Sequence, residues 1–233
     1  MSTWQAGMIV RFFSICTLLA HIPAFAEPTA DTATSEATSR VVVGFPDARL
    51  EAAIREAIDK PSGNIHASDL EGLTVLKAAT RGVSRLTGIE YCTDLRDLGL
   101  DQNQIADISP LANLTKLSVL ASSENEIVDI SPLANLTKLS VLGLNQNKIA
   151  DISPLANLTE LSQLSLLRNA IVDIGALTNL TGLEGLWLDY NQVVNITALV
   201  NLTQLNRLGL HQNQIIDISP LVNLTQLLSL IHI

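Results

Sequence analysis

The residues best suited to chemistry gather between positions 167 and 211 of this 233-residue chain. Tryptophan, tyrosine and arginine are the types most enriched at the energetic centres of protein interfaces. Here they are joined by a histidine, an aspartate and a leucine, which suggests recognition by apolar contact, ring stacking and charge. We predict that a partner is bound by Leu167, Arg168, Trp187, Asp189, Tyr190, Arg207 and His211.

Catalysis is a much weaker hypothesis for the same residues. Asp189 and His211 resemble part of a catalytic triad, but no serine or cysteine nucleophile is placed to complete it. Metal-protease motifs, phosphate-binding glycine loops and paired cysteines are missing from the sequence. We therefore predict no catalytic residue, no metal site and no cofactor, and a protein that is not an enzyme.

A 22-residue repeat positions the candidate residues. The unit that begins at Leu95 recurs with unchanged spacing, and a degenerate copy precedes it at Leu73–Asp94. A fixed period of this length is the signature of stacked repeats. The leucine that opens each unit is found at 95, 117, 139, 161, 183, 205 and 227, and an asparagine column runs through Asn103, Asn125, Asn147, Asn169, Asn191 and Asn213.

Each unit has the pattern of a short strand followed by a tight turn. Alternation at Leu98 and Leu100 predicts a strand with one buried face, and successive strands pair in parallel about 4.8 Å apart. We expect the asparagine to bond backbone groups of its turn and of the next unit, and Ser109 to cap a helical turn before Pro110. The predicted fold is an α/β solenoid: a leucine-rich repeat with short parallel strands on the concave face, 3-10 or irregular turns on the convex face, and an N-terminal helical cap.

Positions between and after the buried strand leucines should point to the concave face. One such column holds Gly99, Ala121, Gly143, Ser165, Trp187 and Gly209. An aromatic residue on an open sheet has no role in the core, so we favour a binding patch centred on Trp187. The alternative is that Trp187 leans over Gly143, Gly185 and Gly209 and only fills a hollow.

An aspartate column recurs at the turns, broken once by Asn195. Stacked carboxylates offer the oxygen ligands that Ca²⁺ prefers. An aspartate before a turn more often accepts backbone N–H groups of that turn, and we favour this second interpretation. The column consists of Asp107, Asp129, Asp151, Asp173 and Asp217.

The first 40 residues differ from the rest of the chain. Arg11 precedes the apolar run 12–20, and a small-residue cleavage signal ends at Ala26, so residues 1–26 are predicted to be a signal peptide. The apolar run is too short to span a membrane. We expect a secreted, periplasmic or cell-surface protein, with an uncleaved N-terminal anchor as the alternative. Residues 27–40 are small and polar and are predicted to be a disordered leader.

Residues 41–72 are predicted to form an N-terminal cap that covers the first leucine layer, ahead of the repeats at 73–233 (one degenerate, six full and one truncated unit). Val41–Val43 has the pattern of a strand. Apolar spacing predicts a helix from the N-cap Asp47 to Lys60, and a shorter helix should start near Ser68.

The cap and the repeats together resemble a known family. Phe45-Pro-Asp-Ala-Arg-Leu-Glu-Ala-Ala-Ile54, then Ser68-Asp-Leu-Glu-Gly-Leu73, then units ending Ile-Ser-Pro-Leu-Ala-Asn-Leu-Thr are similar to bacterial internalins, which are leucine-rich repeat proteins. The resemblance covers roughly residues 41 to 230. It implies an exported, curved solenoid that binds another macromolecule through its concave sheet.

Charge narrows the choice of partner. The chain has 14 basic and 23 acidic residues, and loss of the signal peptide would remove Arg11 and no acid, taking the net charge from −9 to −10. Nucleic acid and anionic membranes are therefore poor partners, and no membrane span is predicted after cleavage. We predict an exported module that binds a protein, with a glycan as the alternative.

A second hypothesis concerns assembly. The last unit stops inside its strand without a capping segment, and exposed sheet edges favour association. The alternative function is therefore a structural, self-assembling segment that pairs through this open layer, or a truncated fragment of a larger surface protein; we favour truncation as the explanation of the open layer.

Overall fold

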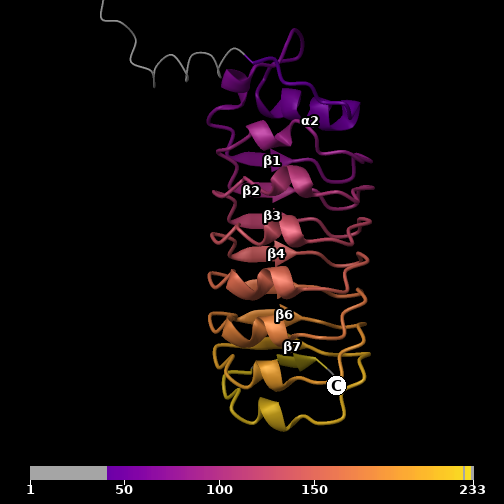
Figure 1. Cartoon of the computed structure of the whole chain (residues 1–233), viewed down its shortest axis with the longest axis vertical. Helices are drawn as coiled ribbons and strands as arrows, with labels where there is room; N and C mark the ends of the chain where they lie inside the picture. Colours follow the sequence, from indigo (N-terminus) through magenta and orange to yellow (C-terminus); the bar gives the residue numbers. More distant parts are fainter. Residues whose placement is uncertain (1–40, 228, 232–233) are drawn as a thin grey trace, which may run out of the picture. The chain divides into compact units, whose positions relative to one another are not determined.

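The computed structural model describes residues 41–227 and 229–231, which all fall within one compact unit, Thr38–Ile233. The predicted signal peptide and leader lie outside the described residues. In the described part, short strands form one column and short helices another along the stack of repeats (Figure 1).

One parallel sheet runs through the repeats, with its strands in chain order. Each residue pairs with the residue 22 positions later, as Leu98 does with Leu120, so the sheet register and the sequence period are the same. The degenerate first unit supplies β1, which pairs with β2 in the same register. The strands are β1 (Val75–Lys77), β2 (Asp97–Gly99), β3 (Val119–Ala121), β4 (Val141–Gly143), β5 (Gln163–Ser165), β6 (Gly185–Trp187), β7 (Arg207–Gly209) and β8 (Ser229–Ile231).

A 3-10 helix follows each of the strands from β1 to β7, as predicted. Its cap differs from the prediction. Ile108 is the N-cap residue and Ser109 is already helical; the Oδ1 atom of Asp107 accepts the Ser109 backbone N–H at 2.8 Å. The aspartate does this because its short side chain reaches the N–H two residues on. The helices are η2 (Ile89–Tyr91), η3 (Ser109–Leu111), η4 (Ser131–Leu133), η5 (Ser153–Asn157), η6 (Gly175–Asn179), η7 (Thr197–Leu199) and η8 (Ser219–Leu221).

The core is a continuous column of aliphatic side chains, such as Leu98, Leu120 and Leu142, each 0–1 % exposed. The asparagine column bonds backbone at the edge of this core, as predicted, but toward the preceding unit. Nδ2 of Asn147 donates to the carbonyls of Leu144 and Ser122, and its Oδ1 accepts the Ile127 N–H at 3.0 Å. These bonds tie each unit to the one before it, because they pair backbone groups that would otherwise be unsatisfied.

The N-terminal cap consists of α2 (Ala48–Ala57), η1 (Ala67–Leu70) and an antiparallel bridge between Val42 and His66. The predicted strand at Val41–Val43 is therefore a single bridge, and the helix ends three residues before Lys60. Asp47 is the N-cap, as expected: its Oδ1 accepts two N–H groups of the helix. Its Oδ2 accepts the N–H groups of Ser84 and Arg85, which joins the cap to the first repeat.

Candidate functional site on the concave sheet

A column of residues with left-handed backbone lines the rim of the sheet, just after each strand. Such conformations are uncommon outside glycine, especially for bulky residues. Here the column is imposed by the turn that every unit repeats, and nothing in its residue types signals it. Its members in the full units are Gln102, Glu124, Gln146, Arg168, Tyr190 and Gln212, with φ between 52° and 57°.

Three predicted site residues meet at this rim. The Arg168 guanidinium carbon lies 4.8 Å from the centroid of the Tyr190 ring, a cation–π contact. The His211 ring meets Tyr190 edge to face, with centroids 5.4 Å apart. Tyr190 is exposed and Arg168 is exposed, so the cluster presents an aromatic face flanked by cationic and imidazole groups.

Trp187 lies on the sheet itself, in register between Ser165 and Gly209. Its ring leans over Gly185: a Cβ placed on that glycine would lie 2.7 Å from the ring. The ring therefore covers one of the three glycines that the hollow-filling alternative names, whereas the atoms nearest to Gly143 and Gly209 belong to other residues. Trp187 remains partly exposed, so the ring both fills this hollow and presents a surface.

Arg207 and Leu167 complete the surface. Arg207 is exposed and pairs in register with Gly185, which places it beside the glycine that Trp187 covers. Leu167 is partly exposed at the end of the neighbouring unit's strand. The concave patch is hereafter defined by Leu167, Arg168, Trp187, Tyr190, Arg207 and His211.

Asp189 has an internal role that the sequence analysis missed. The side chain is only 7 % exposed, because its Oδ1 accepts the His211 backbone N–H at 3.0 Å and its Oδ2 lies against Gly209. It supports the patch from beneath instead of presenting its carboxylate to a partner. Asn145 and Asp101 accept the equivalent N–H groups two and four repeats earlier, respectively. A period of 44 residues in polar side chains was therefore the signal for this role.

The aspartate column at the turns also has an internal partner in each unit. The Oδ1 atoms accept the N–H two residues on at 2.8–2.9 Å, which confirms the turn interpretation. Within residues 41–227 and 229–231, no group of three or more acidic, histidine or cysteine side chains is arranged to hold a metal ion. No helix in the same part of the chain is long and apolar enough to cross a membrane.

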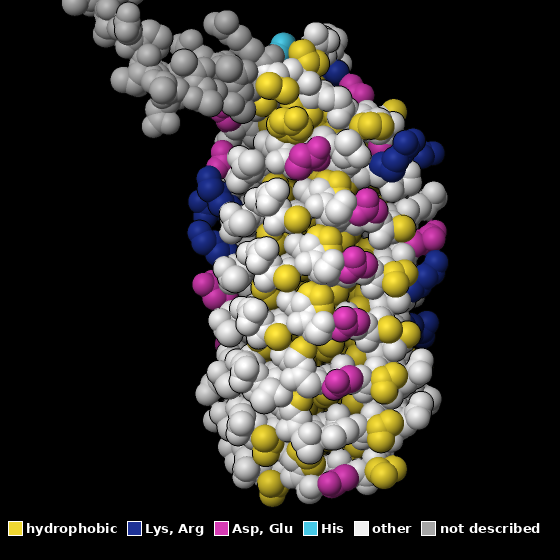
Figure 2. Space-filling model, viewed as in Figure 1, with side chains coloured by type: hydrophobic (Ala, Val, Ile, Leu, Met, Phe, Trp, Pro, Cys, Tyr) yellow, Lys and Arg dark blue, Asp and Glu magenta, His cyan; other side chains and the backbone are white. Residues whose placement is uncertain are grey.

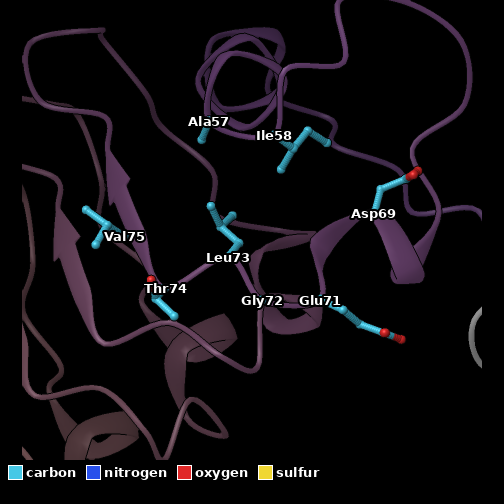
Figure 3. A pocket seen from close by; sticks show the side chains of 8 residues that line it. All are labelled: Ala57, Ile58, Asp69, Glu71, Gly72, Leu73, Thr74 and Val75. Atoms are coloured by element: carbon cyan, nitrogen blue, oxygen red, sulfur yellow. The ribbon is translucent and has the colours of Figure 1, made fainter.

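A hollow of about 420 Å³ lies at the junction of the cap and the first repeat. Ile58 and Leu73 face it, whereas the carboxylates of Asp69 and Glu71 extend away from each other (Figure 3). The Asp69 carboxylate accepts the His66 N–H and pairs with Lys60, and both contacts lower its pKa. The polar groups do not converge, so the hollow lacks the arrangement expected of a ligand site.

Comparison with known proteins establishes the family. A model for leucine-rich repeats in two copies matches residues 119–157. The structure is similar to internalin C2 of Listeria monocytogenes, with 38 % sequence identity over 78 % of this chain and 92 % of that one, and a TM-score of 0.64. The chain belongs to the internalin family.

Two further structures show the range of this likeness. A second internalin of Listeria monocytogenes, InlF, is 38 % identical over 78 % of this chain and 68 % of its own, with a TM-score of 0.61. The plant peptide hormone receptor RGFR1, solved in complex with RGF2, is 27 % identical over 60 % of this chain and 24 % of its own, with a TM-score of 0.55. The repeat architecture is thus shared beyond internalins.

Proposed function

We propose that this internalin-family protein is an exported binding module that recognises a protein through the concave patch. One observation carries the proposal: Trp187 and the cluster of Arg168, Tyr190 and His211 are exposed or partly exposed on one face of a rigid sheet. Tryptophan and tyrosine lose little conformational entropy on binding, and together with arginine they are the side chains most enriched at the energetic centres of interfaces. The complex of the plant receptor with RGF2 supports a role of this kind for the architecture.

Export rests on the segment 1–26, whose Arg11, apolar run and Ala26 form the pattern of a signal peptide. A protein partner is favoured over a glycan because the patch combines rings with two arginines. The planar guanidinium groups of Arg168 and Arg207 suit carboxylates, which a neutral glycan lacks. A partner surface with acidic and apolar groups would complement the patch.

A phage-displayed random peptide library selected on the purified protein tests the proposal. Most independent binders should depend on Trp187: Trp187→Ala should weaken them about 30-fold, the loss typical of a hot-spot residue. Val141→Ala is the matched control, since Val141 is also exposed on the sheet. Its binding should stay within about threefold of the parent protein. A majority of binders unaffected by Trp187→Ala, or lost with Val141→Ala, would contradict the proposal.

A further inference from the structure

A second exposed surface runs along the flank of the repeats, away from the strand residues that form the concave patch. One residue in each unit, between the buried isoleucine that follows the asparagine and the turn aspartate, points outward. We call this column the flank ridge. Val128, Val172 and Val194 are 58 %, 52 % and 43 % exposed, so these apolar side chains contribute little to the core. A row of exposed apolar side chains is typical of an interaction surface. The ridge comprises Ala106, Val128, Ala150, Val172, Val194 and Ile216.

The aspartate column lies beside the flank ridge. Figure 2 shows acidic side chains in a line along the stack with apolar side chains next to them. Each carboxylate is oriented by the turn N–H that it accepts, and backbone and hydroxyl donors at Ser153 and Ser219 lower the pKa values of Asp151 and Asp217. In the described part of the chain, no recorded ion pair involves these aspartates. The aspartate column, called the aspartate ladder below, is therefore a row of fixed negative charges.

Hollows between successive units join the two columns. One of about 380 Å³ is lined by Val128, Ile130 and Ala150 together with Asp129 and Asp151. The next, of about 350 Å³, shares Ala150 and Asp151 with the first and continues to Val172, Ala176 and Asp173. Each hollow thus combines apolar lining residues with two acidic ones, and the combination repeats with the period of the chain.

We propose that the flank ridge and the aspartate ladder form a docking surface for a cationic amphipathic segment of a partner protein. Apolar side chains of that segment enter the hollows, and its lysines or arginines pair with the ladder. Charge complementarity selects this occupant. Anionic membranes and nucleic acids are repelled by the ladder and by a net charge of −9, and a second copy of the chain would bring the same charges.

The chain supplies its own structure-preserving substitutions. Asn195 occupies the aspartate column and accepts the Thr197 N–H at 2.8 Å, so Asp→Asn retains the turn. Threonine has the β-branched shape of valine with a hydroxyl in place of one methyl, so this change lowers the apolar character of the ridge while keeping its shape. The test pairs are therefore Asp151→Asn with Asp173→Asn, and Val128→Thr with Val172→Thr. The control pair, Glu160→Gln with Glu184→Gln, changes the net charge equally at exposed sites elsewhere.

The probe is a synthetic peptide of lysine and leucine in which leucines recur every three or four residues, so that a helix has one apolar face. Binding is measured by fluorescence anisotropy. Each test pair should weaken binding about tenfold, the control pair less than about twofold, and replacement of leucine by serine in the peptide about tenfold. Trp187→Ala should leave this affinity unchanged, which separates this surface from the concave patch.

Three results would overturn the docking surface. Equal losses in the test and control aspartate and glutamate pairs would mean that the peptide senses only net charge. If the serine peptide binds as tightly as the leucine peptide, apolar side chains do not enter the hollows. Loss of binding with Trp187→Ala would mean that the peptide binds at the concave patch instead. None of these results depends on whether the concave patch binds its own partner.

Discussion

The concave face has two halves of different chemistry on the same backbone. From β1 to β4 the outward residues are small or aliphatic except Lys77 and Asp97, which neutralise each other in an ion pair of 2.6 Å. From β5 to β7 the same columns hold Trp187 and Arg207, and the rim holds Arg168 and Tyr190. The strand register and the asparagine bonds are the same in both halves. We call the strand register and the asparagine bonds together the frame. The surface residues vary while the frame stays the same, as a binding protein requires.

If the frame is the same in both halves, removal of one asparagine should have the same effect in each. Asn147→Ala in the first half and Asn191→Ala in the second each remove the acceptor of one backbone N–H, that of Ile127 or Ile171. Each also removes three bonds that the asparagine amide donates to carbonyls. Since an unsatisfied buried N–H costs on the order of 1–3 kcal/mol and the lost bonds add to this, we expect each change to lower the free energy of unfolding by about 3 kcal/mol.

Urea unfolding measures both losses. Lys148→Ala, at an exposed site next to Asn147, is the control and should change the free energy of unfolding by less than about 0.5 kcal/mol. Losses that differ between Asn147→Ala and Asn191→Ala by more than about 1 kcal/mol would show that the two halves have different frames.

Acid should weaken the first half before the second, because only the first half adjoins the cap. Partial burial acts to raise the pKa of Asp47, but N–H donors from Ser84, Arg85, Arg49 and Leu50 lower it to about 2. The pKa in the unfolded chain is higher, so the stabilisation is present above about pH 4 and is lost as the pH falls toward 2. The contribution at neutral pH is about 2 kcal/mol.

Comparison with Asp47→Asn isolates this contribution. The difference in unfolding free energy between the parent protein and the variant should shrink between pH 4 and pH 2.5, and amide exchange at acid pH should accelerate first in the cap and at β1. A difference that stays constant across this range would contradict the assignment to the Asp47 carboxylate.

The sequence was sufficient to predict the frame, but it did not predict the direction in which individual side chains point. The columns of Leu98 and Asn103 are present in all six full units, so their burial and backbone bonding follow from the period. Asp189 also belongs to a period, but one of 44 residues, and a 22-residue comparison hides it. The Trp187 ring leans over Gly185 because that neighbour has no side chain. The 22-residue period does not predict toward which neighbour the ring turns. The left-handed rim at Tyr190 has no signal in residue type, since glutamine and arginine share the position.

The smallest expected effect concerns the two halves of the rim. Tyr190 and Arg168 are in cation–π contact, whereas their counterparts Gln102 and Glu124 share an exposed hydrogen bond of 3.1 Å. Glutamine occurs naturally in this column, so Arg168→Gln and Tyr190→Gln keep the turn. A double-mutant cycle by thermal unfolding should give a coupling of about 0.5–1 kcal/mol for the cation–π pair. The exposed Gln102–Glu124 pair should give less than about 0.5 kcal/mol, because water competes for an exposed bond. Equal coupling in the two cycles would mean that the aromatic rim adds nothing to the fold, and that the two halves differ only in the surface they present.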